Sequence, residues 1–141
     1  MPSPTTAQQV IKAGCILINT QTKKIGLIYR EKHQDYTFAK GHLEANETLY
    51  DCALRETEEE TQRKAEILTP LEAQTYTTKK GKICTVHWYL AKDMGPSLKI
   101  IDSHLQHQLI WQDPASVKDI LTHENLKNLW LTHQAKIISY L

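Results

Sequence analysis

The chain has 141 residues, a formal net charge of +1, 40% hydrophobic residues and 23% charged residues. This length fits one domain with a buried core, and the small net charge excludes a general attraction to DNA or to a membrane surface. No apolar run approaches the roughly 20 residues of a membrane span. Cys15, Cys52 and Cys84 show no CxxC spacing, which argues against a disulfide framework and a structural zinc site. Because the N-terminus lacks the features of a signal peptide, we expect a cytoplasmic protein.

The first part of the chain is predicted to form strands. We expect a flexible N-terminus over residues 1–9 and a single domain over residues 10–141. Apolar, β-branched stretches predict strands at residues 10–18 and 24–30, joined by a hairpin turn. After a polar loop, a further short strand is expected at residues 36–39.

A helix is predicted to begin near Thr48. Thr48 and Asp51 have the spacing of a capping box, and apolar residues then follow at helical intervals. Arg63 and Lys64 would lie at the end of this helix, where positive charge is favourable.

Strand patterns return after this helix, and helices close the chain. Strands are expected at residues 65–68, 72–78, 83–91, 98–101 and 108–111, with a hairpin at the TTKKGK segment around Gly81. Asp113 and Pro114 are typical of a helix start, and apolar residues step by three or four from Leu126 to Leu141. This order of elements predicts an α+β fold in which a mixed sheet lies between helices.

The predicted first helix carries an unusual cluster of carboxylates. At about 100° per residue, Glu56, Glu59 and Glu60 share one face, whereas Glu58 lies on the opposite face and is expected to be solvated. Like charges at these spacings destabilise a helix. A solvated acidic face balanced by basic neighbours is one explanation. The other is a bound divalent cation, because carboxylate oxygens without sulfur ligands suit Mg²⁺ or Mn²⁺.

The spacing around this cluster resembles a known motif. From Gly41 the chain reads glycine, five residues, Glu47, seven residues, Arg55-Glu56, two residues and Glu59-Glu60. This pattern resembles the Nudix box of hydrolases that act on nucleoside diphosphates linked to another group. The resemblance implies a Nudix-type α/β/α sandwich in which the box forms a strand, a loop and a helix.

Segments outside the box resemble the asymmetric bis(5′-nucleosyl)-tetraphosphatases, which are Nudix enzymes that hydrolyse diadenosine tetraphosphate. The resemblance lies in residues 36–44, 85–91 and 109–111. The chain departs from the Nudix pattern at Thr57, usually aliphatic, at Gln62, usually glycine, and at Arg63, usually apolar. It departs from the subgroup at Phe38 and Ala39, where prolines are usual. A late glutamate of the subgroup is also missing, because residues 103–108 hold no carboxylate and only Asp102 precedes them.

The resemblance implies a role for each residue of the box. Glu56, Glu59 and Glu60 would hold Mg²⁺ or Mn²⁺ together with the backbone carbonyl of Lys40, and Glu59 or Glu60 could act as the base. Glu47 and Arg55 would form an internal ion pair that shapes the loop. The implied reaction is in-line attack of a metal-activated water that splits diadenosine tetraphosphate into ATP and AMP.

Other readings of the same chain remain open. A Nudix pyrophosphohydrolase could instead act on 5′-triphosphate RNA, an inositol pyrophosphate or a nucleoside triphosphate. A nucleotide sensor that kept the fold and lost turnover is a further alternative. In each case the expected partner is a small nucleotide-like molecule, without DNA or membrane, and the expected state is a monomer or a weak dimer.

Further side chains are candidates for substrate binding because four phosphates need more positive charge than metal ions supply. Lys40 lies beside the box and is the first candidate. The lysines of the TTKKGK hairpin are also candidates, but an exposed turn that aids solubility explains them equally well. The phosphate candidates are Lys40, Lys79, Lys80 and Lys82, with Arg30 and His42 behind them. For stacking on a base, the candidates are Tyr76, Trp88 and Tyr89. Strand alternation allows at most one of Trp88 and Tyr89 to face the cleft. Trp111 and Trp130 are predicted to be core residues, and His87, His104 and His107 could line the site.

Overall fold

The structure is a computed structural model and describes residues 9–99 and 107–141. Its strands form one mixed sheet in the order β3-β2-β1-β7-β5, with β4 paired to β1, β6 to β7 and β8 to β2. The strands are β1 (Gln9–Asn19), β2 (Lys24–Arg30), β3 (Asp35–Thr37), β4 (Ala39–His42), β5 (Arg63–Pro70), β6 (Gln74–Thr77), β7 (Ile83–Pro96) and β8 (His107–Gln112). The helices are α1 (Leu49–Thr61), the 3₁₀ turn η1 (Pro114–Ser116), α2 (Val117–Ile120) and α3 (Glu124–Ser139).

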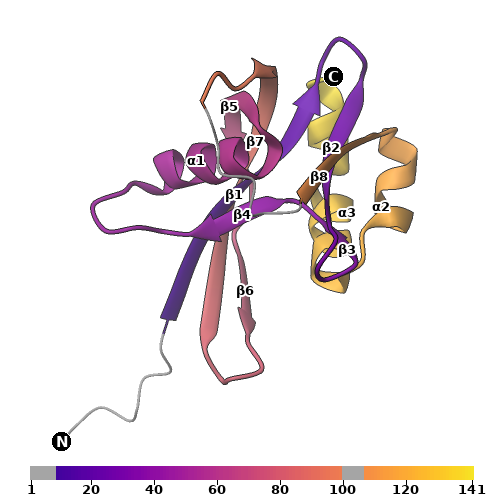
Figure 1. The fold of residues 1–141 in the computed structure, drawn as a ribbon. Coiled ribbons are helices and arrows are strands. Elements are labelled where there is room, and N and C mark those ends of the chain that lie inside the picture. The colour runs from indigo at the N-terminus through magenta and orange to yellow at the C-terminus, as the bar shows by residue number, and fades with distance from the viewer. Residues whose placement is uncertain (1–8, 100–106) are drawn as a thin grey trace, which may run out of the picture.

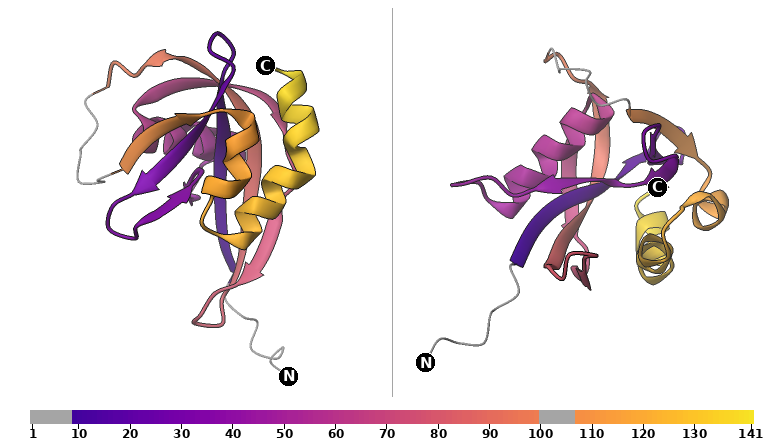
Figure 2. Two further views of the ribbon diagram at one scale, coloured as in Figure 1. Left: turned by 90° about the vertical axis from the view of Figure 1, so that its right-hand side faces the viewer. Right: turned by 60° about the horizontal axis from the view of Figure 1, so that its bottom comes forward.

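Helices cover both faces of this sheet, which gives the predicted α+β sandwich. Helix α1 lies on one side, and α2 and α3 lie on the other (Figures 1 and 2). The core is accordingly divided in two. A large cluster that includes Trp88 and Trp130 fills the side of α3, and a smaller one that includes Cys15 and Cys52 lies under α1.

Strand β1 forms the centre of the sheet and is buried on both faces. It runs parallel to β7 along its length, from Gln9 opposite Ile83 to Ile18 opposite Lys92. Because successive side chains alternate between faces, Cys15 packs toward α1 and Ile16 packs toward α3. This explains why residues 13–18 of β1 form a continuous apolar run and not an alternating pattern.

Strand β4 reaches β1 through a close backbone approach at Gly14. A Cβ atom at this position would lie 2.0 Å from the carbonyl oxygen of Ala39 and 2.6 Å from the Cβ of Lys40. Only glycine therefore allows the observed pairing of Gly14 with Lys40. This pairing holds Lys40 and Gly41 beside the central strand β1, where β4 contacts α1.

Most of the predicted elements are present, with shifted boundaries. The expected strand at 36–39 is two strands, β3 and β4, because Phe38 between them turns into the core. The first helix ends at Thr61, so Arg63 and Lys64 belong to β5 and not to the helix. Strand β7 continues to Pro96 because it pairs with β5. Of the strand expected at 98–101, Leu98 and Lys99 are irregular, and the remaining positions lie outside the described residues.

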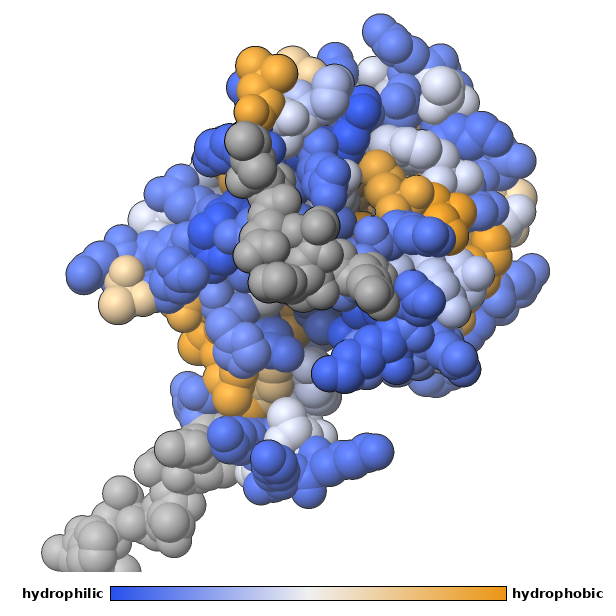
Figure 3. Space-filling view, in the orientation of Figure 1, coloured by the Kyte–Doolittle hydropathy of each residue, from blue (hydrophilic) through white to orange (hydrophobic). Residues whose placement is uncertain are grey.

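The face of the molecule drawn in Figure 3 is largely hydrophilic. On the face seen in Figure 1, apolar residues form separate patches among polar ones (Figure 3). None of the helices in the described part of the chain combines the length and the apolar character that crossing a membrane requires.

Candidate active site

Helix α1 carries the acidic cluster and is anchored at both ends. At its start, the Thr48 hydroxyl accepts a hydrogen bond from the Asp51 backbone N–H (3.0 Å), as the capping pattern predicts. At its end, Gln62 adopts a left-handed conformation (φ 59°), and its N–H donates to the Glu58 carbonyl. The helix therefore stops in the manner of a glycine cap, although the chain has glutamine at this position.

The acidic face of α1 packs directly against β4 at Gly41. A Cβ atom on Gly41 would lie 2.0–2.3 Å from the carboxylate atoms of Glu56. The glycine of the motif is therefore required by the space that Glu56 occupies, and not by an unusual backbone conformation.

Glu60 is the most deeply buried acid of the cluster. The Lys40 backbone N–H donates to its Oε2 (2.7 Å), which ties α1 to β4. Burial, and then the negative charge of Glu56, raise the pKa of Glu60 to about 8. Burial also raises the pKa of Glu56, and the Glu59 charge adds to this effect. The structure therefore brings the three acids into one electrostatically unfavourable cluster.

Arg55 is the cation that partly neutralises this cluster. Its Nη1 donates to Glu56 (2.8 Å) and to Glu59 (3.2 Å), and its Nε donates to Glu47 (2.7 Å). Its Nη2 donates to Glu47 and to the His42 carbonyl, both at 3.0 Å. The pair with Arg55 lowers the pKa of Glu47 to about 2. The predicted Glu47–Arg55 pair is present and ties the loop after β4 to α1.

The donor set of the cluster fits a hard divalent cation. Carboxylate oxygens are the ligands that Mg²⁺ and Mn²⁺ prefer, and two of the three acids are largely buried with raised pKa values. In the arrangement described for residues 9–99 and 107–141, Arg55 bridges Glu56 and Glu59, and no three His, Cys, Asp or Glu side chains are grouped so that they could hold a metal ion. Metal binding through Glu56, Glu59, Glu60 and the Lys40 carbonyl therefore remains a prediction, and it would require Arg55 Nη1 to move aside.

Glu58 does not belong to the cluster, but the expectation that it is solvated is wrong. Its side chain is only 16% exposed. It accepts hydrogen bonds from the Ser97 hydroxyl (2.9 Å) and pairs with Lys99 (3.0 Å). Glu58 therefore fastens the end of β7 to the outer face of α1, away from the other three acids.

His107 lies beside Glu60 at the start of β8. Its Nδ1 is 3.8 Å from Glu60 Oε1, and this buried nitrogen has no hydrogen-bond partner among the described residues. Burial, and then the Arg30 charge, lower the pKa of His107, which favours the neutral imidazole. Of the other predicted histidines, His104 lies outside the described residues, as does Asp102.

A pocket of about 260 Å³ opens next to the acidic cluster, and we call it the Arg30 pocket. It is lined by Arg30, Thr37, Lys40, Tyr76, His123, Asn125 and Leu126. Lys40 connects the two sites, because its backbone N–H binds Glu60 while its side chain lines the pocket. Burial, and then the charges of Lys12 and Arg30, lower the pKa of Lys40. A poorly solvated lysine close to other cations favours an anionic ligand.

The residues predicted to bind phosphate differ in how close they lie to the Arg30 pocket. Lys40 lines the Arg30 pocket. His42 lies at the end of β4 and is largely exposed, and partial desolvation, followed by the charges of Lys12, Lys40 and Lys82, lowers its pKa. The charges of Lys82 and of Lys12, which the sequence does not single out, therefore reach His42, whereas Lys80 is exposed in the hairpin.

The three aromatic candidates lie in three different environments. Tyr76 lines the Arg30 pocket. Trp88 is 1% exposed in the core beside Phe38, so no face of its ring is free for a base. Tyr89 points to the opposite face of the sheet, where its ring packs edge-on against Tyr50. Trp88 and Tyr89 therefore lie on opposite faces of the sheet, as strand alternation predicts, and the aromatic residue that reaches the pocket is Tyr76 on β6.

Residues of β3 and of the start of α3 form a wall of the pocket that no local sequence pattern indicates. Thr37, His123 and Asn125 lie in this wall, and Asp35, which the sequence predicts to lie in a polar loop, belongs to β3. Asp35 is the last residue before the aromatic start of the predicted strand. Its position opposite Arg30 could be found only with the β2–β3 register.

The mixed sheet between helices, with an acidic helix packed against a glycine-containing strand and loop, defines the class of the protein. A family model for the NUDIX domain matches residues 9–138. The chain therefore belongs to the Nudix family.

Several solved structures share this fold. A NUDIX hydrolase from Nitrosomonas europaea is similar with a TM-score of 0.76 and 13% identity, over 92% of this chain and 90% of that chain. The E. coli ORF135 protein gives a TM-score of 0.73 and 20% identity, over 95% and 96%. The C. elegans Ap4A hydrolase gives a TM-score of 0.71 and 23% identity, over 92% and 99%. At these identities the similarity establishes the fold.

Proposed function

We propose that the protein is a Mg²⁺-dependent pyrophosphohydrolase, with Mn²⁺ as an alternative ion, and that its substrate is a dinucleoside polyphosphate. Diadenosine tetraphosphate, split into ATP and AMP, is the substrate that we favour. The observation that carries this proposal is the junction at Lys40, where the acidic cluster meets a cationic pocket of about 260 Å³.

The pocket has the chemistry that a nucleotide needs. Arg30 and Lys40 supply positive charge for phosphates, and the Tyr76 ring supplies a face on which a base can stack. The Asn125 amide at the rim can donate and accept hydrogen bonds to a base. The C. elegans structure, an Ap4A hydrolase with the same fold, supports the choice of substrate.

Each residue of the site has a separate role in the proposed hydrolysis. Glu56, Glu59 and Glu60 would hold the divalent ion, which supplies an activated water and offsets charge on the phosphates. Glu60 is held in place by the Lys40 N–H, and Glu59, which is 40% exposed, stands at the solvent edge. One of these two carboxylates takes the proton of the attacking water. The new P–O bond forms as the bond to the leaving nucleotide breaks, and Arg30 and Lys40 balance the charge on the phosphates.

A substrate panel tests this proposal. The protein is incubated with Mg²⁺ or Mn²⁺ and with diadenosine tetraphosphate, ATP, 5′-triphosphate RNA and an inositol pyrophosphate, and the products are separated by chromatography. We expect diadenosine tetraphosphate to be the preferred substrate and ATP and AMP to be the products. Preference for another compound would overturn the substrate assignment. Tight nucleotide binding without turnover of any compound would overturn the enzymatic assignment and indicate a nucleotide sensor.

A further inference from the structure

The arginine of the Arg30 pocket is fixed from behind by a buried aspartate. Arg30 on β2 and Asp35 on β3 are register partners. The Nε of Arg30 donates to Asp35 Oδ1 (2.8 Å) and Nη2 donates to Oδ2 (2.5 Å). Asp35 is 3% exposed, so this two-point contact is shielded from water. It uses two of the five N–H groups of the guanidinium, and Nη1 has no acceptor among the described residues.

A second residue holds the aspartate from the other side. His123, which directly precedes α3, lies with its Nε2 2.6 Å from Asp35 Oδ2. A carboxylate only accepts hydrogen bonds, so Nε2–H is the donor. The neighbouring Thr122 hydroxyl accepts from the Tyr36 N–H (2.9 Å), which ties the start of α3 to β3. Asp35 is thus immobilised between β2 and α3.

The resulting orientation suits a phosphate group. An arginine fork can bind a carboxylate along one edge and an oxyanion along the other, and a fork that is already ordered loses less entropy on binding. Arg30 and Lys40 line the same pocket, the Lys40 backbone N–H binds the Glu60 carboxylate, and the charges of both Lys40 and Arg30 act on that carboxylate. An oxyanion bound by Arg30 would therefore lie between the cationic pocket and the acidic cluster.

We propose that Asp35 and His123 are positioning residues that hold the Arg30 guanidinium as a fixed ligand for a phosphate group of the nucleotide. This inference rests on the proposed function, because it names the residues that hold a phosphate of that substrate. It also makes the start of α3 part of the binding site, although α3 is remote from the Nudix box in the sequence.

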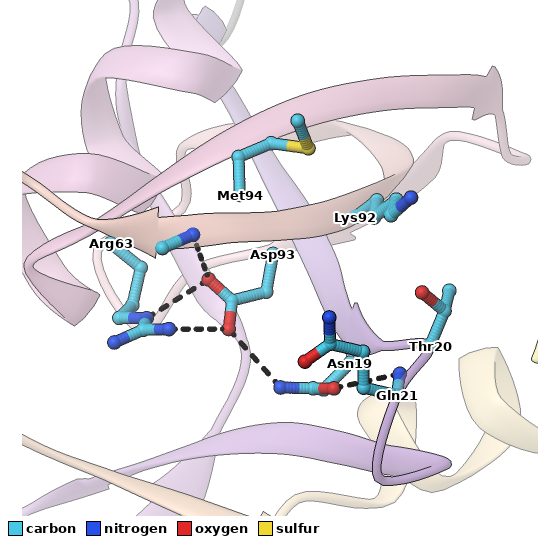
Figure 4. Close-up of a pocket in the computed structure, with 8 residues that line it drawn as sticks. Asn19, Thr20, Gln21, Arg63, Lys92, Asp93 and Met94 are labelled. Atoms are coloured by element: carbon cyan, nitrogen blue, oxygen red, sulfur yellow. Dashed lines mark hydrogen bonds and ion pairs between the residues drawn. The ribbon is translucent and has the colours of Figure 1, made fainter.

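The molecule contains a matched control for this arrangement. Arg63 on β5 binds Asp93 on β7 through the same atoms, Nε (2.9 Å) and Nη2 (2.8 Å), and Asp93 is equally buried (Figure 4). Gly95 N–H and Asn19 Nδ2 complete the contacts of Asp93. This pair lines a different pocket, which shares no residue with the acidic cluster or with the Arg30 pocket. Asp93→Asn therefore removes an equivalent ion pair without touching the site.

The test measures binding in the absence of metal. Dissociation constants for ATP and for inorganic triphosphate are determined in EDTA for the wild type, Arg30→Lys, Asp35→Asn, His123→Ala, His123→Gln and Asp93→Asn. We expect Arg30→Lys and Asp35→Asn to weaken both ligands about tenfold, the scale of a lost charge-assisted hydrogen bond. His123→Ala should weaken them about threefold, and His123→Gln, whose amide can still donate to Asp35, should restore part of the loss. Asp93→Asn should stay within about twofold of the wild type.

Three results would overturn the inference. Wild-type affinity in Arg30→Lys would show that the fork binds no phosphate. Wild-type affinity in Asp35→Asn, with weakened binding in Arg30→Lys, would show that Arg30 needs no positioning. An equal loss in Asp93→Asn would show a general effect of stability.

The experiment also distinguishes misfolding of a variant and failure of the proposed function from failure of this inference. If circular dichroism shows Asp35→Asn unfolded, Arg30→Lys and the two His123 variants decide the question. Failure of the proposed function would be recognised differently, as absence of turnover in the substrate panel while this pattern of binding constants persists.

Discussion

At the scale of single residues, the acids of α1 differ by environment, and this difference sets what each can do. Glu60 is buried and held by β4, Glu59 stands at the solvent edge, and Glu58 is committed to Ser97 and Lys99 on the other face of α1. These three neighbouring carboxylates therefore have separate assignments, although their side-chain chemistry is identical.

Substitution of these glutamates by glutamine should separate the two faces of α1. We expect Glu59→Gln and Glu60→Gln to lower kcat at least about a hundredfold, the scale at which loss of charge stabilisation is felt in enzymes. Glu58→Gln should keep turnover within about twofold and lose about 1 kcal/mol of unfolding free energy from its contacts. Steady-state kinetics at saturating Mg²⁺ and urea unfolding would measure both. Near-native rates in the Glu59 and Glu60 variants would contradict the assignment.

Asp35 predicts a pH dependence of stability. Its contact with Arg30, and the further one with His123, lower the pKa of Asp35 below its ordinary value of 3.8. The ionised carboxylate therefore stabilises the folded state above that value, and this contribution is lost as the pH falls through the lower, folded-state pKa. The difference in urea midpoint between wild type and Asp35→Asn should be largest near pH 7 and should narrow toward about pH 3. A difference that stays constant over this range would contradict the role of the ion pair.

Among the secondary-structure elements, α1 ends with a strained backbone conformation at Gln62, which a substitution could relieve. Gln62 holds φ at 59°, while its N–H and carbonyl bond Glu58 and Ser97. Glycine adopts this conformation without a steric penalty, so Gln62→Gly should raise the unfolding free energy by about 0.5–1 kcal/mol and leave turnover unchanged. Gln62→Ala keeps the penalty and is the matched control. A loss of stability in Gln62→Gly relative to Gln62→Ala would contradict this explanation.

The elements themselves could largely be predicted from local patterns. The cap at Thr48 marks the start of α1, and the β-branched runs mark β1, β2 and β7. The end of α1 could not be predicted in the same way. Arg63 suits a helix C-terminus by charge, but tertiary pairing with the buried Asp93 draws it into β5. A partner 30 residues away outweighs the local preference.

At the scale of the whole molecule, the site combines one contiguous motif with one dispersed pocket. The motif could be predicted because Gly41, Glu47 and the acids of α1 depend on spacing along the chain. The pocket could not, because its residues come from β2, β3, β4, β6 and the start of α3 and meet only through sheet register and helix packing. Strand alternation predicts that Trp88 and Tyr89 cannot both face the cleft, but no local sequence pattern indicates that His123 lines the pocket.

We expect the three acids of α1 to need a divalent cation, and calorimetric titration measures its uptake. Mg²⁺ and Mn²⁺ are titrated into the protein with and without ATP, and into Glu56→Gln, Glu60→Gln and the control Glu58→Gln. We predict uptake of either ion by the wild type and by Glu58→Gln, and its loss in the other two variants. Absence of uptake of both ions by the wild type, whether or not ATP is present, would show that the acids of α1 form no site for a divalent cation.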